Sequence, residues 1–299
     1  MTTPMHRNRP AARRKFNAFM RRIAFYFRKK PSDMFLGALT WICSAFTFAI
    51  LIFLILYITV KGVPYIKPSL FSLKYSTETV SLFPALVTTV MMVAASLLIA
   101  TPVGVFAAIY LVEYARRGNR LVKLVRVTTE TLSGIPSIVY GLFGWLFFVT
   151  ALKWGFSLLA GSFTLSIMIL PLIMRTTEES LKSVPDIYRE GAFGLGAGRL
   201  RTVFVIVLPA AAPGILAGVI LATGRIVGET AALIYTAGTV PQIPGNPLAS
   251  GRTLAIHMYA LSSEGLYTGQ AYATAVILLI TVVGINALSA ALAKKLAGA

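Results

Sequence analysis

Long apolar runs limit what this chain can fold into more than any other feature of its sequence. They cover Phe35–Val60, Pro84–Val112, Ile135–Leu152, Phe156–Met174, Ala212–Thr236 and Ala271–Leu292. Runs of this length and composition are typical of membrane-spanning helices, which satisfy their backbone hydrogen bonds internally. With 57% hydrophobic residues, 13% charged residues and a mean hydropathy of +0.77, the chain is too apolar for an ordinary soluble domain. The sequence therefore predicts an all-α membrane protein with six transmembrane helices. The third is the least secure, because a very short turn, Lys153–Gly155, separates it from the fourth.

The basic residues predict which segments face the cytoplasm. If the N-terminus lies inside, the cytoplasmic segments hold 22 Lys or Arg residues and the external segments hold 5. Such asymmetry orients membrane proteins, so both termini are predicted inside. The first 31 residues carry ten basic residues and no acidic one. This tail is typical of a segment that binds anionic lipid, and a nucleic-acid-binding arm is disfavoured.

The stretch Glu190–Pro209 is too polar and too rich in glycine to cross a bilayer. Glycine weakens helix interiors and permits sharp turns, so one continuous helix is not expected. Asp186 is predicted to cap a short helix that runs through Leu195, and a second short helix is predicted to end near Pro209. A basic elbow of this kind on the inner membrane face suits docking to another protein.

The spacing within this elbow resembles the EAA loop of ABC importer permeases. Glu190, Ala192, Gly196, Ile206, Leu208 and Pro209 match the pattern, and Gly191 stands where the pattern has the middle residue of E-A-A, an alanine. The resemblance implies that the loop seats in a cleft of an ATPase subunit. The residues implied in ATPase coupling are Glu190, Gly191, Ala192, Gly196, Arg199, Leu208 and Pro209. The alternative is an amphipathic linker that matches by chance, whereas a dinucleotide-binding role for GLGAG lacks the required preceding strand.

Four further motifs resemble the permeases of the phosphate-specific ABC importer. They are AIYLVEYA at 108–115, GIPSIVYGLFGW at 134–145, RTTE at 175–178 and RIVGETAALIYTAG at 225–238. The resemblance covers roughly residues 80–295, and the form of the last motif matches one of that importer's two permease subunits. It implies import of inorganic phosphate across a bacterial or archaeal cytoplasmic membrane. It also implies partners: a second permease subunit, two ATPase subunits and an external phosphate-binding protein.

This resemblance suggests a division of the chain. Residues 1–34 are a basic cytoplasmic tail, 35–60 the first transmembrane helix and 61–83 an external loop. An ABC permease domain with five transmembrane helices covers 84–293, and residues 294–299 are a cytoplasmic C-terminus. The permease domain includes a coupling loop at 186–209 and an external loop at 237–270. Within the latter, Thr253–Leu261 is predicted to form a short helix, and both external loops are expected to receive the binding protein.

Arg225 and Glu229 are the most informative charged residues of the predicted spans. They are four residues apart, so the sequence predicts that they share a helical face. Counted from the start of the predicted span, Arg225 lies about 20 Å deep, where each charge costs roughly 2.5–3.5 kcal/mol. Either the two form a static pair that locks helices together, or Arg225 binds an oxyanion while Glu229 holds the guanidinium. Arg175 and Glu178 are candidates for the inner mouth of the same pathway, although positive-inside anchoring alone would explain Arg175.

Several function classes lack their motifs in this sequence. No lysine follows a glycine in a phosphate-binding loop pattern, so ATP and Mg²⁺ are expected to be used by a partner ATPase and no cofactor is expected here. The single cysteine and the two distant histidines form no disulfide and no metal-ligand cluster. We therefore predict a transport subunit rather than an enzyme. The alternatives are a permease for another oxyanion, an ATP-independent anion carrier or channel, and, least favoured, an intramembrane hydrolase.

Overall fold

All the regular secondary structure in the part of the chain that the computed structural model describes, residues 31–116 and 118–297, is helical. The predicted basic tail, residues 1–34, lies largely outside the described residues, which begin at residue 31. The elements along the chain are α2 (Pro31–Gly62), η1 (Val63–Tyr65), η2 (Pro68–Phe71), α3 (Phe83–Ile109), η3 (Tyr110–Tyr114), α4 (Arg120–Ser133), α5 (Ser137–Gly144), η4 (Trp145–Ala151), α6 (Leu158–Ser183), α7 (Asp186–Gly194), α8 (Arg199–Thr202), η5 (Val203–Val207), α9 (Leu208–Val227), α10 (Ala231–Ile234), α11 (Leu254–Glu264) and α12 (Thr268–Ala297).

Five of these helical stretches are long and apolar enough to cross a membrane, and they correspond to five of the six predicted spans. The predicted third span is the exception. Its helical part, Ser137–Ala151, is short and is bent by 104° against the preceding amphipathic helix α4. At about 1.5 Å per residue it falls short of a hydrocarbon core of about 30 Å. A sixth crossing therefore requires α4 and α5 to act together as one broken span.

The chain divides into two compact units, residues 1–57 and 58–299. Within the first unit, the described residues form the greater part of α2. The side chains of its membrane-compatible window are all exposed, and they are apolar around the whole helix. A helix with this surface is suited to lipid on every side.

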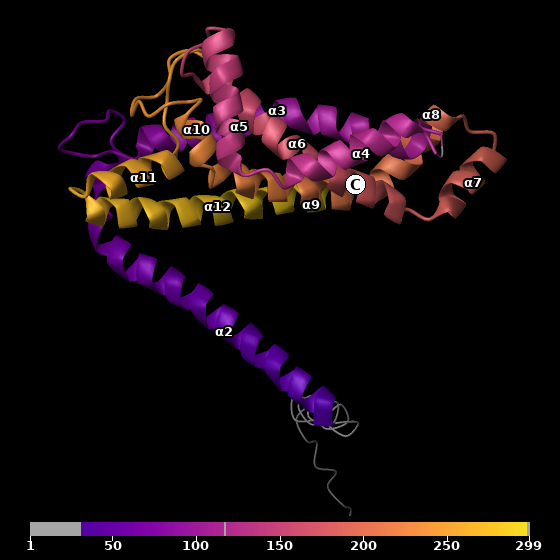
Figure 1. Ribbon diagram of the computed structural model, residues 1–299, viewed down its shortest axis with the longest axis horizontal. Coiled ribbons are helices and arrows are strands. Elements are labelled where there is room, and N and C mark those ends of the chain that lie inside the picture. The colour runs from indigo at the N-terminus through magenta and orange to yellow at the C-terminus, as the bar shows by residue number, and fades with distance from the viewer. Residues whose placement is uncertain (1–30, 117, 298–299) are drawn as a thin grey trace, which may run out of the picture. The chain divides into compact units, whose positions relative to one another are not determined.

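The second unit is a helical bundle whose core lies between α3, α6 and α9, with α12 packed on α9 (Figure 1). Close approach of α6 and α9 depends on small residues. A methyl group at Gly218 would overlap the Thr176 side chain, and one at Gly214 would overlap Ser180. At these two positions, glycine therefore serves close helix packing.

The predicted fifth span begins and ends elsewhere. Its helix starts at Arg199, inside the elbow, and runs without a break through Pro209 to Val227. The prediction that a second short helix ends near Pro209 is wrong. The π-helix η5 ends two residues before Pro209, and Pro209 lies in the first turn of α9, where the N–H that proline lacks is least needed.

The same span ends at Val227 instead of Thr236. Gly228 closes α9, and after a break the short helix α10 packs on α5. Gly141 permits this contact, because an added Cβ would overlap the backbone of Ala232. The chain then runs through an irregular segment to α11. The predicted helix at Thr253–Leu261 is confirmed: it begins at Leu254 and extends to Glu264, with Leu254 and Leu261 fully buried.

Candidate functional site

The candidate substrate site is a cavity of about 410 Å³ lined mainly by residues of α4, α6 and the last turn of α9. It brings together three of the four predicted pathway residues, Arg225, Arg175 and Glu178. Residues Arg126, Thr129, Glu130, Ser133, Leu172, Thr176, Glu179 and Lys182 also line it. We refer to it as the Arg225 cavity.

Arg225 lies two residues before the end of α9 and is half-buried. Long side chains on an α-helix point back toward its N-terminus. The N-terminal end of α9 joins the elbow, so the Arg225 guanidinium extends from deep in the bundle toward the elbow end. This direction explains how a residue near one end of α9 reaches a cavity that also contains Arg175 and Lys182, near the opposite end of α6.

Glu178 forms ion pairs with two other cations. Its Oε1 lies 2.7 Å from Arg126 Nη2 on α4 and 2.6 Å from Lys182 Nζ one turn further along α6. Arg175 is paired with Glu179, with Nε 3.0 Å from Oε1, and both side chains are largely exposed. The ion pairs among the described residues include none for Arg225. Among the described residues, the Arg225 guanidinium is therefore in the cavity without an ion pair, and Glu130 is the lining carboxylate that also has none.

Glu229 does not lie on a helical face with Arg225, and this prediction is wrong. The sequence gives the spacing of four residues, but α9 ends before Glu229, so helical geometry does not apply. Glu229 is buried, and its Oε1 accepts a hydrogen bond of 3.0 Å from the Ala232 N–H in the first turn of α10. This carboxylate holds the break between α9 and α10 instead of holding the arginine.

The elbow has the predicted bend. Helix α7 starts at Asp186, and Gly196 has a positive φ of 80°, which a residue with a side chain adopts only with strain. The chain reverses there, closed by a hydrogen bond of 3.0 Å from the Ala197 N–H to the Ala192 carbonyl, and α8 begins at Arg199. Asp186 lies inside the first turn, where its charge suits the helix dipole, and Pro185 occupies the capping position predicted for it.

The elbow exposes the side chains expected of a docking element. Glu190, Gly191, Gly196 and Arg199 are exposed, whereas Ala192 is buried beneath them. Leu195 is 91% exposed at the tip. Further exposed apolar side chains surround it on both arms, namely Ile187, Tyr188, Phe193 and Leu200. Of the remaining predicted coupling residues, Leu208 is half-buried and Pro209 is exposed, where the elbow continues into α9.

An ion-pair cluster that sequence reasoning missed anchors this elbow. Arg189 of α7 donates to Glu113 of η3 from Nη2 (2.7 Å) and Nε (3.1 Å), and both side chains are largely buried. The same guanidinium donates to the carbonyls of Leu181 and Val184 at the end of α6. Glu113 stands as the one acidic residue at the start of a strongly basic loop, and that contrast could have marked it as a paired residue.

A second buried polar cluster lies at the opposite end of the bundle. The buried Arg252 stacks over the Tyr75 ring, with its Cζ 4.7 Å from the ring centroid, and the fully buried His257 meets the same ring edge-on at 6.2 Å. Burial and the charge of Arg252 lower the pKa of His257 to about 3, so the imidazole is neutral at physiological pH. Arg252 and Tyr75 belong to the two predicted external loops, which this cluster joins.

In the described part of the chain, no group of three or more His, Cys, Asp or Glu residues could hold a metal ion.

A bundle of membrane-length helices with a guanidinium in an internal cavity and an exposed, anchored elbow defines a permease. Comparison with known proteins gives the particular family. Residues 100–298 match the binding-protein-dependent transport system inner membrane component, and the chain belongs to this family.

Related sequences and solved structures agree with this assignment. The chain is 34% identical to the phosphate transport system permease protein PstA of Haemophilus influenzae, over 88% of this chain and 94% of that protein. It is 33% identical to a probable ABC transporter permease protein, YqgI, of Bacillus subtilis, over 80% and 86%. Among solved structures, a bacterial alginate ABC transporter matches with a TM-score of 0.64 and 15% identity, over 89% of this chain and 96% of that chain. The inward-facing methionine transporter MetNI matches with a TM-score of 0.55 and 20% identity, over 72% and 94%.

The fold is therefore that of a type I ABC importer permease, and the chain is a multi-pass membrane transport subunit rather than an enzyme.

Proposed function

We propose that this chain is the PstA-type permease subunit of an ATP-driven importer that moves inorganic phosphate into the cytoplasm. The observation that carries the proposal is the unneutralised Arg225 in a cavity inside the bundle. The related phosphate permeases support the choice of substrate: the Haemophilus influenzae protein is similar over nearly its whole length.

The charges around the Arg225 cavity suit an oxyanion. Three carboxylates line the cavity. Glu178 and Glu179 are each held by cations of their own, and Glu130 is the one lining carboxylate without an ion pair among the described residues. A guanidinium presents paired donors that match two oxygens of a phosphate, and its charge persists at every physiological pH. Phosphate passes Arg225 without covalent chemistry. Arg175 lies at the exposed mouth of the same cavity.

The elbow is the coupling element of this proposal. Its exposed apolar tip around Leu195 enters a cleft of the partner ATPase, and Glu190 and Arg199 flank the contact. Two copies of the ATPase bind and hydrolyse ATP with Mg²⁺, whereas this chain binds no cofactor. Because Arg189 ties α7 to η3 and α6, force on the elbow reaches helices that line the Arg225 cavity.

The other partners occupy the remaining faces. A second, phosphate-specific permease subunit completes the pathway, and an external binding protein delivers phosphate to the loops at 61–83 and 237–270. The Arg252–Tyr75 contact joins these two loops, so they form one receiving surface. The charge asymmetry of the sequence supports an orientation with both termini and the elbow inside the cytoplasmic membrane of a bacterium or archaeon.

Co-purification and uptake together test this function. Glu190 is exposed and makes no ion pair among the described residues, so Glu190→Lys should insert and fold normally. We expect this variant to co-purify with the second permease, lose the ATPase and lose phosphate uptake. Glu264→Lys, an equal charge reversal at the end of α11, is the matched control and should retain the ATPase. Normal ATPase retention in Glu190→Lys would contradict the coupling role.

Substrate identity needs a separate measurement. Uptake of labelled phosphate is expected to persist in excess sulfate and to fall in excess unlabelled phosphate. Equal competition by both anions would favour a permease for another oxyanion.

A further inference from the structure

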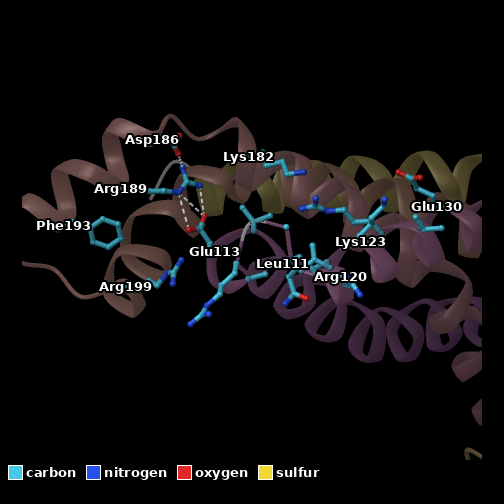
Figure 2. Close-up of a pocket in the computed structure, with 18 residues that line it drawn as sticks. Leu111, Glu113, Arg120, Lys123, Glu130, Lys182, Asp186, Arg189, Phe193 and Arg199 are labelled. Atoms are coloured by element: carbon cyan, nitrogen blue, oxygen red, sulfur yellow. Dashed lines mark hydrogen bonds and ion pairs between the residues drawn. The ribbon is translucent and has the colours of Figure 1, made fainter.

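A second cavity, of about 1000 Å³, lies between α4, the end of α6, α7 and the segment that joins η3 to α4 (Figure 2). It adjoins the elbow through Phe193 and Arg199, whereas Leu195 at the tip of the elbow does not line it. Only Leu111, Glu130, Arg126 and Lys182 line both this cavity and the Arg225 cavity. We refer to it as the basic cavity.

Its lining is strongly cationic. Seven basic side chains, Arg116, Arg120, Lys123, Arg126, Lys182, Arg189 and Arg199, line it together with three acidic ones, Glu113, Glu130 and Asp186. Arg189 neutralises Glu113 and also pairs with Asp186 at 3.2 Å. Glu130 lies at the far end from that cluster (Figure 2). Two of the three carboxylates are therefore not available to the other cations.

Four of these cations, Arg199 among them, lack a partner among the described ion pairs. Arg116, Arg120 and Lys123 are exposed, and no carboxylate of the described residues lies within ion-pair distance of them. Arg199 rests on the face of Tyr114, with its Cζ 5.3 Å from the ring centroid, which leaves its charge unneutralised. Like charges gathered in one hollow repel one another, so this arrangement is stabilised when an anion occupies it.

Ion pairs fix the walls of the basic cavity before any ligand arrives. Arg189 and Glu113 tie α7 to η3, and Arg126 and Glu178 tie α4 to α6 at 2.7 Å. At the start of α4, the Asn119 side chain accepts a hydrogen bond of 2.9 Å from the Leu121 N–H. The hollow is thus preformed, and its cations do not have to be assembled by the ligand.

Helix α4 also carries an exposed apolar face. Lys123, Val127 and Glu130 follow one another at helical spacing along the cavity wall. Leu121 and Leu124 lie on the other side of the helix and are 68% and 61% exposed. A helix with one basic face and one exposed apolar face is suited to the boundary between lipid headgroups and acyl chains.

We propose that the basic cavity binds the phosphate of an anionic phospholipid headgroup, with the acyl chains lying against the apolar face of α4. Arg120 and Lys123 contact the phosphate oxygens, and Arg116 and Arg199 supply the surrounding positive potential. The bound lipid fills the hollow between α4 and α7 and so supports the elbow from the membrane side. Binding of lipid at this cavity does not depend on which substrate the permease carries.

Free inorganic phosphate has the same oxyanion chemistry and is the competing source of a ligand. The two exposed leucines of α4 favour the lipid, because a free anion has no use for an apolar surface beside its site. The cavity is also about twice the volume of the Arg225 cavity and is lined by apolar residues as well as by charges, among them Leu111, Val122, Val127 and Phe193.

Native mass spectrometry of the purified transporter complex tests the proposal. The full chain, with its partner subunits, is titrated with phosphatidylglycerol or with phosphatidylcholine, and retained lipid is counted. We expect one tightly retained phosphatidylglycerol. Since each basic residue near an anionic headgroup is worth roughly a fivefold change in affinity, the Arg120→Gln/Lys123→Gln double variant should bind about 25-fold more weakly.

Matched variants separate lipid binding from folding and from transport. Lys153→Gln makes the same change at an exposed lysine outside the cavity and should retain the lipid. Lys123→Gln alone gives a readout if the double variant fails to assemble, and Arg120→Lys should restore binding. Arg225→Gln should lose uptake and keep the lipid, so failure of the transport proposal would leave this one standing.

Three results would overturn the lipid assignment. The first is equal retention of phosphatidylglycerol by the double variant and the unchanged protein. The second is equal retention of phosphatidylcholine. The third is binding of inorganic phosphate that depends on Arg120 and Lys123 and displaces the lipid.

Discussion

At the scale of single residues, the charges of this permease divide into those that hold the fold and those left free to act. Glu113, Glu178 and Glu229 all bind groups of the protein itself: Arg189, two cations, and a backbone N–H of α10. Arg225 has no such carboxylate among the described residues. Of the three acids that line its cavity, Glu178 and Glu179 are paired with other cations, and this supports a functional role for Arg225.

The first prediction concerns Arg225 itself. Arg225→Lys should reduce phosphate uptake about tenfold or more, because lysine offers a compact charge in place of a paired fork. Arg225→Gln should abolish uptake. Uptake is measured with labelled phosphate alongside the yield of assembled complex, which should stay normal since no ion pair of the described residues is lost.

If Arg225 were a static packing residue, both changes would lower complex yield instead. Arg201→Lys is the control, because Arg201 is exposed, lies outside the Arg225 cavity and keeps its charge in this change. Normal uptake by Arg225→Gln would remove this residue from the pathway.

The second prediction uses the buried His257. Its pKa in the folded protein is about 3, below the 6.5 of an unperturbed imidazole. The unfolded chain therefore binds the proton more readily. The resulting contribution to stability is complete above pH 6.5 and is lost as the pH falls from 6.5 toward 3, at up to about 1.4 kcal/mol per pH unit.

This pH dependence is measured as the difference between two chains. His257→Phe keeps a ring against Tyr75 but cannot titrate. Unfolding followed between pH 7 and pH 5 should show the unchanged protein losing stability relative to this variant. Parallel curves would mean that His257 is protonated or exposed in the folded state.

At the scale of elements, the elbow and the break after α9 show glycine and proline used in different ways. Gly196 allows a left-handed turn in open surroundings, where an added Cβ would meet nothing within 4 Å. Gly218 allows two helices to approach closely. Pro209 does not end a helix, because it falls in the first turn of α9 after a π-helical turn. The roles of these glycine and proline residues could therefore be assigned only from the surrounding structure.

The third prediction follows from this turn. Gly196→Ala creates no clash but places a side chain at φ +80°, at a cost of roughly 1–2 kcal/mol. The elbow should relax, and ATP-coupled uptake should fall severalfold while membrane insertion stays normal. Gly198→Ala is the matched control. A Cβ added at Gly198 also meets nothing within 4 Å, but the φ of Gly198 is −71°, so this change should leave ATP-coupled uptake unaltered. Equal effects of the two changes would show that backbone geometry is not the cause.

At the scale of the whole molecule, the bundle contains the Arg225 cavity, and ion pairs at the elbow end of the bundle anchor the elbow. Arg189 joins α7 to η3 and α6, and Arg126 joins α4 to α6. Both α4 and α6 also line the Arg225 cavity. A movement of the elbow therefore reaches the cavity through direct contacts.

The fourth prediction concerns orientation. In a Cys43→Ser background, a cysteine replacing Asn246 should react with a membrane-impermeant thiol reagent in intact cells. A cysteine replacing Leu195 is also exposed in the folded chain, and it should react only after the cells are permeabilised. Labelling of the Leu195 site from outside would reverse the orientation and remove the elbow from the ATPase.

The sequence alone was sufficient for whatever depends on local composition and spacing. Apolar runs of membrane length gave the helical class and five of the spans, and the glycine-rich pattern at 190–209 gave the elbow, because both follow from a few neighbouring residues. The tertiary structure decided the rest. The sequence could not show that α9 stops before Glu229 or that Glu113 reaches Arg189 across 76 residues. These features depend on packing between segments distant in the chain, and local periodicity carries no information about which of them meet.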